Sequence, residues 1–384
     1  MQPGEPLLPL WAMEFFASLF LYAWLFCVGA SVGSFLNVVV YRLPRSLSLV
    51  HPGSFCPSCG HAIRLRDNIP ILGWLSLRGR CRDCQAPIAA RYFWVELAVA
   101  AIFLLVAIVE TKLTGTFPRR NWDPARWLVS PYETIPFWSA YALHVILLTT
   151  LLAAALIDFD RAQVPERLFI PVVLIAVILS AFVPALSQRP AVPSQMTGWQ
   201  GGLPSALFGW AFGLALGGVL GFLWSTASRG GWPRFAPVGL FVAAGIMLDW
   251  RSTLLVAAAA SLLFLGSILV LRLAKSKSTV PYAALLMAAI LPPLLDLDIR
   301  LGLSLPTAIR ESSLLFAAIS LMTFLACAAL AAAFAPAQYF ELAAPSSAPE
   351  APSSAPEAPS STPADVPPSD FTADTLTQHE APLP

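Results

Sequence analysis

The chain is too hydrophobic to be a soluble globular protein. It has 384 residues, of which 57% are hydrophobic and 12% are charged, and its mean hydropathy is +0.70. Soluble domains carry about 25% charged residues, so the composition excludes an ordinary soluble enzyme or binding module. The net charge of +1 identifies no partner, because basic and acidic residues are segregated along the chain.

Apolar segments close to the length of a membrane-spanning helix recur along the chain. A helix needs about 20 mainly apolar residues to cross the hydrocarbon core of a bilayer. We therefore predict an all-α polytopic membrane protein with about eight or nine transmembrane helices. The expected spans are 15–40, 93–109, 137–157, 168–186, 204–225, 236–248, 252–271, 280–295 and 312–334.

Four regions are expected from shifts in composition. They are a first span (1–40), a basic loop that contains cysteines (41–92), a helical membrane body (93–334) and a tail (335–384). The tail repeats Ala-Pro-Ser-Ser-Ala-Pro-Glu and contains no Lys or Arg, so we expect a disordered acidic extension. The polar and aromatic segment 111–135 is longer than the connections around it, and its sequence indicates no role.

Two cysteine pairs lie in the basic loop, as Cys56-Pro-Ser-Cys59 and Cys81-Arg-Asp-Cys84. Four thiolates at this spacing can close a tetrahedral Zn²⁺ site, with two sulfurs from each pair. We therefore predict a small zinc-ribbon-like insertion with a structural Zn²⁺ ion. The alternative is a pair of structural disulfides, which a reducing compartment disfavours.

The distribution of basic residues predicts which side of the membrane carries this loop. If the cysteine loop is inside, fifteen Lys and Arg residues fall on the cytoplasmic side and eight on the other side. The positive-inside rule then places the N-terminus outside and the zinc loop in the cytoplasm. The segment 110–135 is an exception, with four basic residues on the outer side.

Short motifs follow one another from residue 33 to residue 97. They are Gly33-Ser-Phe-Leu-Asn-Val-Val-Val-Tyr-Arg42-Leu-Pro44, Cys56-x-x-Cys59, Asn68-Ile-Pro70, Leu77-Arg-Gly-Arg-Cys81-x-x-Cys84 and Arg91-Tyr92-x-x-x-Glu96-Leu97. This stretch resembles the N-terminal region of the bacterial type IV prepilin peptidases. Members of that family are membrane aspartic peptidases of the Gly-x-Gly-Asp type. They remove the leader from pilin-like precursors and methylate the new N-terminus.

The resemblance also implies one catalytic residue. Ala155-Leu-Ile-Asp158-Phe-Asp160-Arg-Ala-Gln-Val-Pro165 resembles the family segment in which the first catalytic aspartate lies seven residues before a proline. This spacing selects Asp158 rather than Asp160. A carboxylate at the cytoplasmic mouth of a span can activate water. From the residues alone, the favoured interpretation is that both aspartates are interfacial charges that end a helix.

The second catalytic aspartate of the family is missing. An aspartic protease needs two carboxylates that share one proton. The family supplies the second from Gly-x-Gly-Asp, normally followed by Lys-Leu. In this chain Pro237 stands where the aspartate belongs and Gly239 where the lysine belongs. Glu166 and Glu96 are possible substitutes, and without one of them proteolysis is doubtful.

Two functions of different classes therefore stay open. The first is a leader peptidase and N-methyltransferase that acts on type IV prepilin-like or pseudopilin precursors, with S-adenosylmethionine as methyl donor. The second is a non-catalytic homologue that binds or assembles pilin-like or secretion-system helices. Either protein would be a multi-pass protein of the bacterial inner membrane in contact with lipid, and we expect no nucleic acid partner. The methyl-donor site is not assigned to any residue.

Overall fold

Helices form the regular structure of this protein wherever it is described. The computed structural model describes residues 9–108, 131–186, 202–227, 235–248, 250–273, 282–294 and 321–322. The main helices are α1 (Leu10–Arg42), α3 (Arg91–Ile108), α5 (Pro131–Phe159), α6 (Ile170–Leu186), α7 (Leu203–Ala227), α8 (Pro237–Met247), α9 (Trp250–Leu273) and α10 (Tyr282–Leu294). Shorter elements are η1 (Leu65–Asp67), α2 (Leu72–Ser76) and η3 (Glu166–Phe169). Within these ranges there is no named β-strand, only two isolated β-bridges in the cysteine loop.

Five of the described helices are long and apolar enough to cross a membrane. The candidate spans are Phe15–Arg42, Arg91–Ile108, Trp138–Phe159, Ala206–Thr226 and Thr253–Leu273. The expected spans at 168–186, 236–248 and 280–295 correspond to α6, α8 and α10, which have 17, 11 and 13 residues. The all-α polytopic membrane fold is thus confirmed. The expected span at 312–334 (apart from residues 321–322), the tail 335–384 and positions 111–130 of the polar segment lie outside the described residues.

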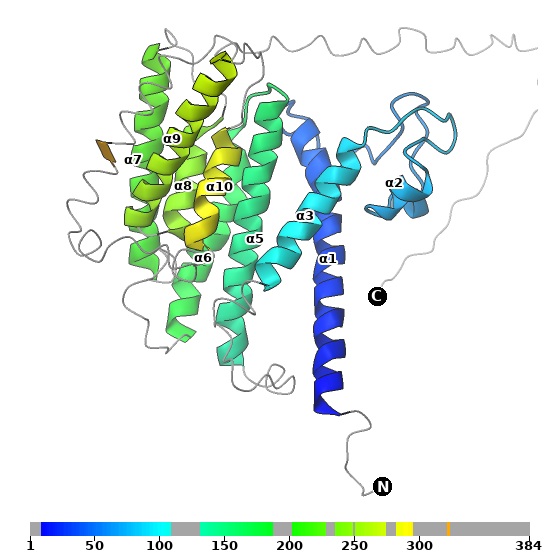
Figure 1. Cartoon of the computed structure of the whole chain (residues 1–384), viewed down its shortest axis with the longest axis horizontal. Helices are drawn as coiled ribbons and strands as arrows, with labels where there is room; N and C mark the ends of the chain where they lie inside the picture. Colours follow the sequence, from blue (N-terminus) through cyan, green and yellow to red (C-terminus); the bar gives the residue numbers. More distant parts are fainter. Residues whose placement is uncertain are drawn as a thin grey trace, which may run out of the picture. The chain divides into compact units, whose positions relative to one another are not determined.

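The described helices pack as a pair beside a larger group (Figure 1). Helix α3 crosses α1 and packs along it, and α5 lies between this pair and the helices α6 to α10. The cysteine loop, which includes α2, connects the end of α1 to the beginning of α3. Helix α5 therefore carries its C-terminal residues into the region where the two sets of helices meet.

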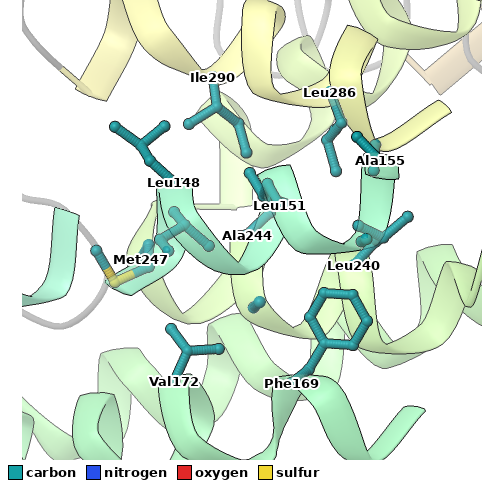
Figure 2. Packing of buried hydrophobic residues seen from close by; sticks show 14 of the residues in the cluster. Leu148, Leu151, Ala155, Phe169, Val172, Leu240, Ala244, Met247, Leu286 and Ile290 are labelled. Carbon is teal, nitrogen blue, oxygen red and sulfur yellow. The ribbon is translucent and has the colours of Figure 1, made fainter. Parts of the chain in front are cut away.

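Helix α8 is the most enclosed helix of the larger group. Ten of its eleven residues are buried, and its sequence is apolar all round, as is typical of a helix in a protein core or a membrane. Figure 2 shows the packing around it. The labelled side chains are Leu148, Leu151 and Ala155 of α5, Phe169 of η3, Val172 of α6, Leu240, Ala244 and Met247 of α8, and Leu286 and Ile290 of α10.

Glycines bring α7 into direct backbone contact with α8. A Cβ atom on Gly213 would overlap the carbonyl oxygen of Phe241, and one on Gly209 would overlap that of Gly245. Small residues four positions apart let two membrane helices approach closely, and van der Waals contact between them then stabilises the pair. Gly218, on the same helix, has no atom within 4 Å of a Cβ built on it.

This contrast predicts opposite effects of one substitution at two positions of α7. Gly213→Ala should lower the free energy of unfolding by about 1–3 kcal/mol, because the added methyl group overpacks the interface with α8. Gly218→Ala should leave stability unchanged or raise it by about 0.5–1 kcal/mol, because alanine favours a helix. Thermal unfolding of the two variants in detergent compares them. Equal destabilisation by both would contradict the close approach of α7 and α8.

Candidate functional site

The four cysteines of the loop converge on one point. Their Sγ atoms all lie within 4.8 Å of one another, and Cys56 and Cys84 have their Sγ atoms 3.7 Å apart. Four sulfurs at about 2.3 Å from a tetrahedral zinc ion lie about 3.8 Å from one another, whereas a disulfide bond is about 2.05 Å long. The four residues are free thiols in this structure. Their geometry fits a metal ion and not the disulfide alternative.

The two cysteine pairs fold in the same way. In the first, the N–H of Gly60 donates to the carbonyl of Cys56, and the N–H of Cys56 donates to the carbonyl of His61. In the second, Gln85 donates to Cys81 and Cys81 donates to Ala86. Gly60 and Gln85 both adopt positive φ angles, of 73° and 59°. Each Cys-x-x-Cys segment thus closes a tight turn that presents two sulfurs on the same side.

Backbone groups around the cluster favour the metal-binding form of one cysteine. The backbone N–H groups of Cys59 and Ser58 donate toward the sulfur of Cys56 and lower its pKa to about 6. Donors aimed at a sulfur stabilise the thiolate, which is the form that binds a metal. Cys56 is therefore suited to bind a cation as the thiolate, and thiolate ligands fit zinc.

Salt bridges and a buried carboxylate hold the loop together and tie it to the helices. The Arg82 side chain donates to both carboxylate oxygens of Asp67, at 2.7 and 2.6 Å. Glu96, in the second turn of α3, is 8% exposed and accepts a hydrogen bond of 2.6 Å from the N–H of Ile71. A further N–H, that of Leu72, donates to the carbonyl of Pro70. The loop between η1 and α2 is thereby attached directly to α3.

The backbone of Ile71 is strained at this attachment. Its φ and ψ angles of 65° and −56° are those of a γ-turn that L-residues rarely adopt. A β-branched residue with positive φ is a genuine outlier, and it persists only where the surrounding structure holds it. Here the carboxylate of Glu96 supplies part of that restraint.

Asp158 and Asp160 lie at the end of α5 in different environments. Asp158 is 3% exposed, and its backbone carbonyl accepts a hydrogen bond from the N–H of Arg161. Asp160 is exposed and forms an ion pair of 2.5 Å with Arg91 at the beginning of α3. The two carboxyl groups are thus separated by burial as well as by their positions on the helix.

The turn that follows Asp158 is anchored on three sides. Arg91 binds Asp160, as described above. Arg167 donates to the carbonyl of Leu43 at 2.8 Å and to Oγ of Ser46 at 3.1 Å, at the end of α1. On the third side, Glu166 binds the beginning of α8. These contacts fix the end of α5 relative to α1, α3 and α8.

A carboxylate from this turn caps the N-terminus of α8. Oε2 of Glu166 accepts a hydrogen bond of 2.6 Å from the N–H of Gly239, the third residue of the helix. The helix begins at Pro237 and is preceded by Ala236 in the left-handed conformation. Free N–H groups and the helix dipole make this end of a helix favourable for negative charge. Glu166 as a residue is exposed, but partial burial of its carboxylate raises its pKa, and the bond from Gly239 partly offsets the effect.

The absence of a side chain at residue 239 makes this contact possible. A Cβ atom on Gly239 would overlap the ring of Phe169 and lie 2.5 Å from Oε2 of Glu166. Phe235, which precedes Ala236, stacks on Tyr282 with the ring centroids 4.8 Å apart, and the Tyr282 hydroxyl lies 3.1 Å from Oγ of Ser261. The beginning of α8 is therefore held by Glu166 and Phe169 at Gly239 and by Tyr282 at Phe235.

Comparisons with known proteins identify the family. A model of the bacterial peptidase A24 N-terminal domain matches residues 27–109. The prepilin leader peptidase/N-methyltransferase of Myxococcus xanthus (strain DK1622) is 36% identical over 156 residues, which cover 41% of this chain and 39% of that protein. The prepilin leader peptidase/N-methyltransferase of Klebsiella pneumoniae is 34% identical over 193 residues, which cover 48% of this chain and 74% of that protein. The chain belongs to the prepilin leader peptidase/N-methyltransferase family.

The similarity does not extend over the whole of every relative. The type 4 prepilin-like proteins leader peptide-processing enzyme of Escherichia coli O78:H11 (strain H10407 / ETEC) is 38% identical over 157 residues, which cover 36% of this chain and 49% of that protein. The chain thus spans less than half the length of this relative and of the one from M. xanthus. No solved structure matches the chain.

The matched domain of the prepilin peptidase family contains the cysteine loop but not the end of α5. Residues 27–109 include the four cysteines and Glu96, and they exclude Asp158, Glu166 and Pro237. Glu96 lies against α1, where a Cβ on Gly33 would be 2.7 Å from its Cα atom, and its carboxylate holds the loop. Glu166 is the acid that reaches the first turn of α8. The pairing of Glu166 with Gly239 was not predicted, although a glycine where the family resemblance implies a lysine was a signal that no side chain fits at that position.

Proposed function

We propose that this membrane protein cleaves the leader from type IV prepilin-like or pseudopilin precursors, with Asp158 and Glu166 as its two acidic groups. The observation that carries the proposal is the contact of Glu166 with the first turn of α8. The family's second aspartate belongs at Pro237, the first residue of that turn. The carboxylate of Glu166, in η3, therefore reaches the N-terminus of α8, where Pro237 provides no carboxylate.

The proposed roles follow from the chemistry of paired carboxyl groups. One ionised carboxylate takes a proton from water while the other, protonated, donates a hydrogen bond to the carbonyl oxygen of the scissile peptide. The hydroxide adds to the carbonyl carbon, the C–N bond breaks, and the leaving nitrogen takes up a proton. The raised pKa of Glu166 suits the protonated partner, and Asp158 is then the base.

Zinc has a structural role in this proposal. Cys56, Cys59, Cys81 and Cys84 would hold the ion as four thiolates, and no open position is left for a substrate. The ion would fix the two turns of the loop, which the Glu96 carboxylate attaches to α3. Methyl transfer from S-adenosylmethionine stays a prediction from the family resemblance.

The proposed location follows from the charge distribution. The cysteine loop and the turn after Asp158 lie on the side to which fifteen of the 23 Lys and Arg residues are assigned, and the positive-inside rule predicts the cytoplasmic face of the bacterial inner membrane for both. The precursor would then meet Asp158 from that side.

Coexpression with a prepilin-like precursor from the same source tests the activity. The intact chain should convert the precursor to a shorter product, and Asp158→Asn should reduce conversion by at least about a thousandfold, since catalytic groups act as a unit. Asp160→Asn is the matched control, and it should retain most of the activity because Asp160 is exposed and its surface ion pair with Arg91 contributes little to stability. Unchanged cleavage by Asp158→Asn would exclude its role as base.

A non-catalytic function is the second candidate, and Pro237 is the observation that favours it. Proline at the first position of α8 provides no carboxylate. In this case the protein would bind pilin-like helices or help to assemble them without cutting them. Copurification of uncut precursor with the intact chain, with no product at any time, would support this function over the peptidase.

A further inference from the structure

The loop between α1 and α3 carries an excess of positive charge that its own structure does not neutralise. Residues 42–91 contain eight arginines and two aspartates, Asp67 and Asp83. Both aspartates are already paired, with Arg82 and Arg64 respectively. Among the described residues, Arg66, Arg78 and Arg80 form no ion pair, and all three are exposed.

Large aliphatic side chains are exposed beside these arginines. Leu65 is 91% exposed, and Leu72 is 61% exposed. Leu72 and Leu75 lie three positions apart on α2 and therefore share a face, and η1, which begins with Leu65, packs against α2. We refer to this region as the η1–α2 surface, which comprises Leu65, Ile69, Leu72 and Leu75 together with Arg66 and Arg78.

The η1–α2 surface is held close to the membrane boundary. Both ends of the loop are ends of membrane-spanning helices, because α1 stops at Arg42 and α3 starts at Arg91. The hydrogen bond from Ile71 to Glu96 ties the turn between η1 and α2 to the second turn of α3. The surface is therefore attached to the ends of two helices that are long and apolar enough to cross a membrane.

We propose that the η1–α2 surface docks on the anionic lipid headgroups of the bilayer around α1 and α3. The leucines would enter the boundary between headgroups and acyl chains, and the arginines would bind phosphates. Interfacial segments have this composition, with apolar residues on one side and Arg or Lys beside them. A lipid surface accounts for both the charge and the exposed leucines, and the tether to α3 keeps the surface beside that lipid.

Hydrogen exchange of the full-length protein in nanodiscs tests the proposal. Amides of residues 65–76 should exchange at least about tenfold more slowly in phosphatidylglycerol nanodiscs than in phosphatidylcholine nanodiscs, since each arginine near an anionic surface strengthens association about fivefold. Arg66→Gln/Arg78→Gln should remove most of this difference, and Arg66→Lys/Arg78→Lys should retain it. Leu65→Ser/Leu72→Ser should remove it while keeping the charge.

Two internal controls show that the loop is still folded. Residues 80–87 form the second cysteine turn and should exchange at the same rate in both lipids. The variants should also keep about one equivalent of zinc, as a single site of four thiolates predicts. Identical exchange of residues 65–76 in the two lipids would overturn the proposal. Protection that appears only when a prepilin-like precursor is added would also overturn it and assign the surface to a protein partner.

Discussion

Glu166→Gln should reduce cleavage of a prepilin-like precursor by at least about a thousandfold while leaving the protein folded. Glutamine retains an oxygen that can accept the hydrogen bond from Gly239, but it cannot ionise or supply the shared proton. Removing one member of a catalytic unit costs several powers of ten in rate. Single-turnover cleavage of purified precursor measures the loss directly.

The structural role of Glu166 can be separated from its catalytic role by two further variants. Glu166→Ala should lose the cap of α8 as well, which lowers the free energy of unfolding by about 1 kcal/mol. Pro237→Asp in the Glu166→Gln background places a carboxylate at the first residue of α8, where the family resemblance implies one. This double variant should recover part of the cleavage, because both positions bring an acid to the same helix terminus.

The pH dependence of stability provides an independent readout. Burial raises the pKa of Glu166 above its ordinary value of about 4.3, so the folded state binds this proton more tightly than the unfolded state does. The protonated Glu166 therefore stabilises the folded state fully below the ordinary pKa of a glutamate. This stabilisation is lost as the pH rises through the raised pKa of Glu166 in the folded protein. Melting temperatures from pH 4 upward should therefore fall more for the parent chain than for Glu166→Gln. Full cleavage by Glu166→Gln would reject the dyad whatever the melting curves show.

Cys56→Ser/Cys81→Ser should eliminate zinc binding and unfold the cysteine loop. The double variant removes one sulfur from each turn and leaves two ligands, which cannot complete a tetrahedral site. Structural zinc sites contribute about 10–16 kcal/mol of apparent binding free energy at neutral pH, and this is folding free energy for a small metal-bound segment. Metal analysis should give about one equivalent for the parent chain and none for the variant.

Cys27→Ser is the matched control for this experiment. Cys27 lies on α1, outside the cluster of four cysteines. Its replacement should leave the metal content and the hydrogen exchange of residues 53–87 unchanged. Absence of zinc from freshly purified parent chain would contradict a zinc site, as would full zinc content in the double variant.

The sequence predicted best those features that depend on local spacing. The two Cys-x-x-Cys segments predicted a four-sulfur cluster, and the apolar segment 236–248 predicted α8 to within one residue at each end. The starts of two spans were predicted equally well, since the candidate spans in α1 and α5 begin at Phe15 and Trp138 against the predicted 15 and 137. The helices themselves begin earlier, at Leu10 and Pro131, because a single acidic residue in the segment that leads into each span does not stop the helix. The boundaries of the four predicted regions stay predictions.

Contacts between distant parts of the chain could not be predicted from spacing. Glu166 and Gly239 are 73 positions apart, and Ile71 and Glu96 are 25 apart. Each contact depends on how the helices pack, which no local pattern contains. The strained backbone of Ile71 could not be predicted either, since isoleucine rarely adopts a positive φ angle.

The tight packing at Gly239 limits what can replace the residues around it. Any longer side chain at that position would collide with Phe169 and with the Glu166 carboxylate. Gly239→Lys alone would therefore displace Glu166 from the N-terminus of α8, where Pro237 offers no acid to replace it. Residues 166, 237 and 239 are thus coupled, and the identity of one determines which side chains the other two can carry.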